Sequence, residues 1–126
     1  MADTFKLTGS YTTEPTSGAP SGDPAIEAAI DEACVLGKKH YTTVVLSTDA
    51  LTAVNFGGLT NAHVIVIRSE GGKVKVTLTS ADGTAQAVPV QYLLAVMNDT
   101  VPVTAIGLTR VVGTSTTVRV FLGELE

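Results

Sequence analysis

Between residues 41 and 123 the chain consists of eight short apolar stretches, rich in Thr and Val and separated by turn signals. Thr and Val together supply 36 of the 126 residues, and both are β-branched side chains that suit a pleated, half-buried surface. Short strands at a regular spacing of about 8–12 residues are typical of an all-β sandwich or barrel. We therefore expect strands at 41–48, 51–56, 62–69, 73–79, 85–90, 92–97, 102–109 and 117–123.

The turns between these stretches favour antiparallel pairing. Gly71-Gly72 and Asp82-Gly83 are strong signals for tight hairpins, because glycine accepts the positive φ that such turns require. Eight strands in one domain most often form two packed sheets, as in a jelly roll. The predicted fold class is mainly β: an eight-stranded antiparallel β-sandwich, jelly-roll-like, with one short helix and an extended N-terminal arm.

The arm is expected to cover residues 1–23. Phe5 to Thr8 alternates as a short strand would, and residues 14–22 hold two Pro and two Gly, which is the composition of an extended linker. The β-sandwich domain then covers residues 24–126. A strand tethered by a linker can pair either with its own body or with a neighbouring molecule.

A helix is predicted at 24–36, at the start of the domain. Asp23 is a preferred N-cap and Pro24 a preferred first helical residue. Gly37 stands where a C-cap is expected, and two lysines follow it. The apolar positions at helical spacing are Ile26, Ala29, Ile30 and Ala33.

Two of the expected strands, 62–69 and 92–97, are apolar on both faces. An antiparallel strand of this kind needs a cover over its outer face. The helix, the N-terminal arm or another subunit could supply that cover. Since two strands need it, we expect the protein to form oligomers.

The composition excludes several classes of function. Charged residues make up only 16% of the chain and the net charge is −4, which argues against nucleic-acid binding because phosphates attract Lys and Arg. No apolar run is long enough to span a membrane, and the N-terminus lacks the features of a signal peptide. Cys34 is the one cysteine, so no intramolecular disulfide is possible.

The inventory of reactive residues does not support an enzyme. The two histidines, His40 and His63, stand apart, with His40 expected in solvent and His63 at a strand end or interface. Together with Cys34 they form no metal-binding pattern. We therefore expect no catalytic residues, no metal and no cofactor. A sugar-binding face is weakly supported, because the chain has no Trp, three Tyr and three Phe.

The region from 41 to 123 resembles the small β-sandwich structural proteins in the virions of tailed bacteriophages. Four segments carry the resemblance. They are Phe56-Gly57-Gly58-Leu59-Thr60, Ile65-Val66-Ile67-Arg68-Ser69-Glu70, Tyr92-Leu93-Leu94 and Thr116-Thr117-Val118-Arg119-Val120-Phe121-Leu122-Gly123. The resemblance covers about two thirds of the chain.

The resemblance implies a capsid decoration (cement) protein or a part of the tail, neck or fibre. The expected partners are the major capsid protein and further copies of the chain, as a dimer or trimer, and the expected location is the virion. A sugar- or receptor-binding module is the alternative from another class. The residues expected at the interface are Phe5, Leu7, Tyr11, Ile65, Ile67, Tyr92, Leu94 and Phe121.

Overall fold

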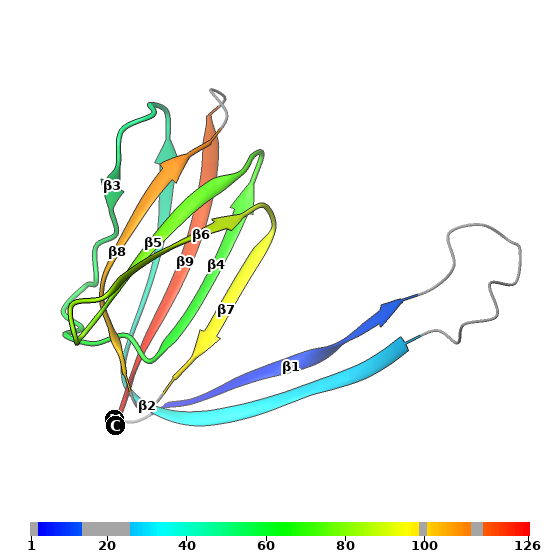
Figure 1. Cartoon of the computed structure of the whole chain (residues 1–126). Helices are drawn as coiled ribbons and strands as arrows, with labels where there is room; N and C mark the ends of the chain where they lie inside the picture. Colours follow the sequence, from blue (N-terminus) through cyan, green and yellow to red (C-terminus); the bar gives the residue numbers. More distant parts are fainter. Residues whose placement is uncertain (1–2, 14–25, 99–100, 112–114) are drawn as a thin grey trace, which may run out of the picture.

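The computed structural model describes residues 3–13, 26–98, 101–111 and 115–126, and gives only the backbone of residues 10–13 and 26–29. Nine strands account for the regular structure of these residues (Figure 1). They are β1 (Asp3–Thr13), β2 (Ile26–Leu46), β3 (Thr52–Ala53), β4 (Val64–Glu70), β5 (Val74–Ser80), β6 (Ala85–Val90), β7 (Leu93–Met97), β8 (Val103–Arg110) and β9 (Thr116–Leu125).

The strands form two antiparallel sheets. The five-stranded sheet has the order β1-β2-β9-β4-β7, and the four-stranded sheet has the order β3-β8-β5-β6. Apart from β1, the strands pair in a nested way: β5 with β6, β4 with β7, β3 with β8 and β2 with β9. The chain from β2 to β9 therefore folds back on itself like one long hairpin. Its successive strand pairs belong in turn to the five-stranded and to the four-stranded sheet.

The core lies between the two sheets and follows from the two-residue alternation of the strands. In β9, Val118, Val120 and Leu122 are completely buried, whereas Arg119 between them is exposed. Ile65 and Ile67 of β4 contribute to the same core from the five-stranded sheet. The four-stranded sheet contributes Val74, Val76, Ile106 and Leu108.

The expectation of a mainly β protein with antiparallel sheets is confirmed. Each of the eight stretches expected as strands overlaps a strand of the structure, from the second half of β2 through to β9. The count of eight is wrong by one, because β1 pairs along its whole length with β2 and so becomes a ninth strand.

The predicted helix is wrong. Residues 26–36 belong to β2, and residues 24–25 lie outside the described part of the chain. The segment Ile-Glu-Ala-Ala-Ile-Asp-Glu-Ala-Cys-Val-Leu also fits a strand, with Ile26, Ala28, Ile30, Cys34 and Leu36 at alternate positions that Glu32 interrupts. Pairing with all eleven residues of β1 gives alternate residues of this segment backbone hydrogen bonds across the ladder, in place of the local ones of a helix.

Gly37 acts as a bulge in β2 and not as a helix cap. Leu36 is paired with Leu125 and Lys38 with Glu124, so the intervening glycine has no partner on β9. A β-bulge bends its strand, and here the bend separates the two halves of β2. Residues 38–46 pair with β9, while residues 26–36 pair with β1 and run away from the body (Figure 1). We call β1 together with residues 26–36 of β2 the ribbon.

Candidate interaction surface

The outer face of the five-stranded sheet is the side turned away from the core. It carries the odd-numbered residues of β9, and opposite them the odd-numbered residues 39–45 of β2 and the even-numbered residues of β4. Three large apolar side chains are exposed on this face: Tyr41 (57% exposed), Val45 (62%) and Leu93 of β7 (59%). The outer face therefore combines a regular sheet with apolar side chains that no described residue covers.

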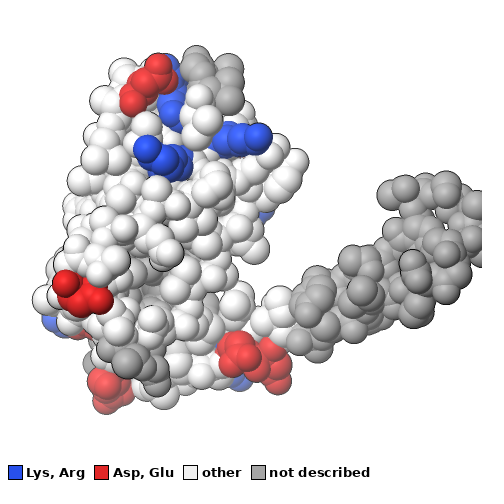
Figure 2. Space-filling view, viewed as in Figure 1, with Lys and Arg blue, Asp and Glu red and all other residues white. Residues whose placement is uncertain are grey.

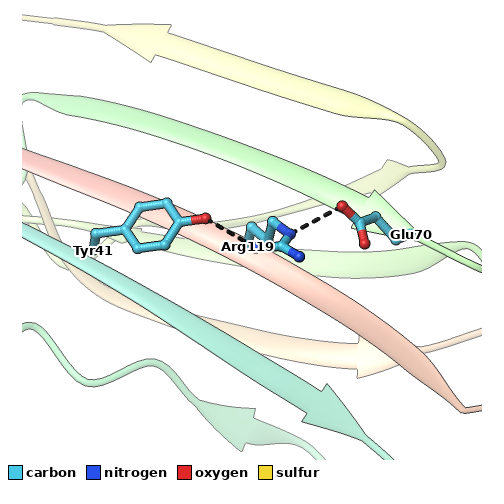
Figure 3. Close-up of polar contacts among 3 residues, drawn as sticks. All are labelled: Tyr41, Glu70 and Arg119. Carbon is cyan, nitrogen blue, oxygen red and sulfur yellow. Dashed lines mark hydrogen bonds and ion pairs between the residues drawn. The ribbon is translucent and has the colours of Figure 1, made fainter.

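A polar cluster lies on the outer face across three strands. Arg119 of β9 donates from Nε to Glu70 Oε1 of β4 over 2.9 Å, and from Nη1 to the Tyr41 hydroxyl of β2 over 3.5 Å (Figure 3). The hydrogen bond to Tyr41, followed by the bond and charge of Glu70, raises the pKa of Arg119 above its usual value. All three side chains are exposed, so they orient one another more than they stabilise the fold.

Positive charge on this face exceeds what Glu70 can neutralise. The register places Arg68 of β4 directly opposite Arg119 of β9, which is an unfavourable arrangement of like charges. Glu70 is ion-paired with Arg119, and Arg68 has no ion pair within the described ranges. On the side of the molecule that Figure 2 shows, Lys and Arg side chains gather beside an acidic one at the end of the body near the β4–β5 turn, and several Asp and Glu side chains lie at the other end and at the base of the ribbon.

The ribbon is attached to the same outer face at its base. The rings of Phe5 and Phe121 stack with centroids 5.3 Å apart, and the side chain of Leu36 lies over Gly123, where a Cβ would come within 2.8 Å of it. Lys39 forms an ion pair of 2.7 Å with Asp3, and this contact lowers the pKa of the Asp3 carboxyl. These contacts fix where the ribbon leaves the body.

A pocket of about 200 Å³ lies where the ribbon meets the body. It is lined by Cys34, His63, Val64, Met97, Asn98 and Leu125. The His63 Nδ1 atom accepts a hydrogen bond of 3.1 Å from the backbone N–H of Leu125, so the imidazole has a structural partner. Burial raises the pKa of the Cys34 thiol, which disfavours the reactive thiolate.

The other histidine has a packing role. His40 is half-buried, contrary to the expectation of a solvated side chain, and its ring lies against Gly57. A Cβ at position 57 would overlap this ring, and Gly57 also has a φ of +62°, in the left-handed region. The Phe56-Gly57-Gly58 turn thus needs glycine for two separate reasons.

The residues expected at an interface separate into four groups. Phe5, Leu7 and Phe121 are half-buried around the base of the ribbon, and Tyr92 is 75% exposed in the turn before β7. Ile65 and Ile67 are completely buried in the core, and Leu94 packs against that core, so none of the three belongs to the outer face. The side chain of Tyr11 lies outside the described part of the structure, although its backbone pairs with Ala28.

The sequence analysis missed Tyr41, Val45, Leu93 and Arg68 as surface residues. Their positions carry a signal, since Tyr41 and Val45 alternate with Leu46 and Val44 in a strand. When both the odd-numbered and the even-numbered residues of a strand are apolar, the pattern does not reveal which set faces the core. For β4 the sequence pattern left Ile65 and Ile67 as candidates for the outer face, but Val66 occupies it, and Val64 is buried at the ribbon pocket.

Within the described ranges, no three His, Cys, Asp or Glu side chains come close enough to hold a metal ion. The same ranges contain no helix long and apolar enough to cross a membrane. Comparison of the chain with protein-family models, with curated proteins and with solved structures found no match.

Proposed function

We propose that the chain is a non-enzymatic structural protein of a tailed-bacteriophage virion that decorates the capsid as an oligomer. The observation that carries this proposal is the combination of a two-sheet body, which exposes apolar side chains on its outer face, with a ribbon that projects from it. A part that holds a lattice together needs a firm body and an extension that reaches a neighbour. Many weak contacts, repeated over the particle, then replace one strong contact.

The strand connectivity supports this proposal. The nested pairs β2–β9, β3–β8, β4–β7 and β5–β6, divided between two sheets, support the proposal of a jelly roll. Jelly rolls are frequent in viral capsid proteins and in lectins. The sequence resemblance to small virion proteins favours the first of these two classes, with the major capsid protein and further copies of the chain as partners.

Quantification on particles tests the proposal. Particles of a phage whose genome encodes the chain are purified, and quantitative mass spectrometry measures the number of copies per virion. Antibody labelling then locates these copies on the particle. A decoration protein is expected in hundreds of copies on the head. Six or twelve copies at the neck or tail would move the protein to the tail class, and absence from the particle would refute a virion role.

Sugar or receptor binding is the second candidate, and the exposure of Tyr92 favours it. An aromatic side chain that is 75% exposed beside the exposed Leu93 could stack on a sugar ring. Glycan-array binding by the purified chain that is lost in Tyr92→Ala and retained in Val111→Ala would support this function. Equal binding by both variants would exclude Tyr92 as the platform.

A further inference from the structure

The ribbon consists of only two strands, and their contacts with each other are too few to make it stable alone. Its two strands pair over eleven residues, but a lone two-stranded hairpin is marginally stable in water and gains stability when a further strand or a packed face is added. The contacts that anchor it to its own body involve Asp3, Phe5, Cys34 and Leu36, all at the base. Beyond the base, neither β1 nor the β2 segment has another of the described strands beside it.

The edges of the two sheets are protected unequally. In the four-stranded sheet, β3 is only two residues long and β6 contains Pro89, and both features discourage pairing with another chain. In the five-stranded sheet, the edge strands β1 and β7 contain no proline, and β7 contains no charged residue. The sheet that carries the ribbon is thus the one left open to association.

The ribbon and the outer face have complementary chemistry. One face of the ribbon carries Leu7, Ile30 and Glu32, since Leu7 is opposite Glu32 and Gly9 is opposite Ile30. The outer face of the body carries exposed apolar side chains and Arg68, which has no ion pair in the described part of the chain. Glu32 is an exposed acid that likewise has no ion pair in that part of the chain. Each molecule therefore presents two separate surfaces, one apolar and acidic on the ribbon and one apolar and basic on the body.

We infer that the ribbon of one copy of this chain lies on the outer face of the five-stranded sheet of a second copy. Leu7 and Ile30 cover the Tyr41 and Leu93 region, and Glu32 approaches Arg68. The partner is a second copy because each molecule presents both halves of the contact. This inference deepens the proposed function by naming the partner of the ribbon.

The area of such a contact is that of a weak association. Beyond the base, residues 6–13 pair with residues 26–33, and eight residues at about 3.4 Å each with two strands about 4.8 Å apart give a face of roughly 260 Å². When two copies exchange ribbons, two ribbon faces and the two surfaces beneath them are covered, which amounts to roughly 1,000 Å² in total. Interfaces below about 1,200 Å² belong to weak complexes, which repetition over many copies strengthens.

Sedimentation velocity of the purified full-length chain is the first test. The unmodified chain is expected to form dimers or trimers, and Tyr41→Glu and Leu93→Glu are each expected to weaken association by at least about tenfold. Val111→Glu is the matched control, because Val111 is as exposed as Tyr41, at 57%, but lies outside both surfaces. A monomeric parent chain, or equal weakening by the control, would overturn the inference.

Crosslinking tests the contact without depending on destabilising variants. In a Cys34→Ser background, Ile30→Cys and Leu93→Cys are made as separate proteins, mixed, and treated with a short bis-maleimide. The inference expects a crosslinked peptide that joins residue 30 of one protein to residue 93 of the other. Crosslinks confined to 30–30 or 93–93 pairs would overturn it.

The outcomes also separate this inference from the virion role. Association through ribbon and outer face in a chain that is absent from phage particles would leave the inference standing and refute the proposed function. Decoration of particles by a chain that shows no 30–93 crosslink would support the proposed function and refute this inference.

Discussion

The ring of Phe5, three residues into the ribbon, stacks on the ring of Phe121 in the middle of the outer face, with centroids 5.3 Å apart and the planes inclined by 19°. The two residues are 116 positions apart in the sequence. The stack joins the ribbon to the sheet from which it projects, next to the ion pair between Asp3 and Lys39. The direction of the ribbon therefore depends on a small number of contacts at its base.

Replacing Phe5 with Ala is expected to loosen the ribbon without unfolding the body. The lost ring stack and apolar contact amount to about 1–2 kcal/mol, and they act locally because β2 is the one described strand that pairs with β1. Amide hydrogen exchange should accelerate in β1 and remain slow in β5 and β8. Leu7→Ala is the control, since it truncates a half-buried ribbon residue that has no ring partner. Equal exchange in the two variants would show that the stack does not anchor the ribbon.

The base of the ribbon is expected to weaken in acid. The hydrogen bond and charge of Lys39 hold the pKa of Asp3 below its ordinary value of 3.8. A carboxyl whose pKa is lower in the folded state stabilises the structure above the unfolded-state pKa, and this stabilisation is lost as the pH falls through the folded-state pKa. NMR titration of Asp3 should therefore give a midpoint below 3.8.

Lys39→Met should return the midpoint of Asp3 to about its ordinary value, while Lys38→Met, which lies opposite Glu124, should leave it low. The effect on global stability should be small because both partners of the ion pair are exposed. An unchanged midpoint in Lys39→Met would mean that Lys39 is not the cause of the shift.

Gly57→Ala is expected to destabilise the body more than Gly83→Ala does. Both glycines have a positive φ, which costs an L-residue roughly 1–2 kcal/mol, but only at position 57 would the new Cβ also overlap the His40 ring. Urea denaturation measures the difference. The double variant Gly57→Ala/His40→Ala should recover part of the loss, and no recovery would indicate that backbone strain alone is responsible.

The division between core and outer face predicts opposite results for two apolar truncations. Ile67→Ala should lower the free energy of unfolding by about 2–5 kcal/mol, because Ile67 is completely buried between the sheets. Leu93→Ala should change it by less than about 0.5 kcal/mol, because Leu93 is mostly exposed. Both are measured by denaturation at a concentration where the chain is monomeric. Similar losses would contradict the assignment of faces in β4 and β7.

The sequence by itself determined the strands and their turns. The β-branched stretches and the Gly71-Gly72 and Asp82-Gly83 turns are local signals, because strand propensity and positive φ depend on residues a few positions apart. They located β4 to β9 to within a few residues, and they indicated that 62–69 needs a cover on its outer side. That cover is supplied in part by the ribbon base, where Val64 is buried.

Only the tertiary structure decided that residues 26–36 form a strand and which residues make up the outer face. Asp3 pairs with Leu36 and Thr13 with Ile26, and this long-range ladder outweighed the capping signals of a helix. Which residues of β2 and β4 point away from the core likewise depends on the Gly37 bulge and on the register with β9. A shift of one residue exchanges the two faces of a strand, so an apolar stretch cannot reveal its buried side until its partner is known.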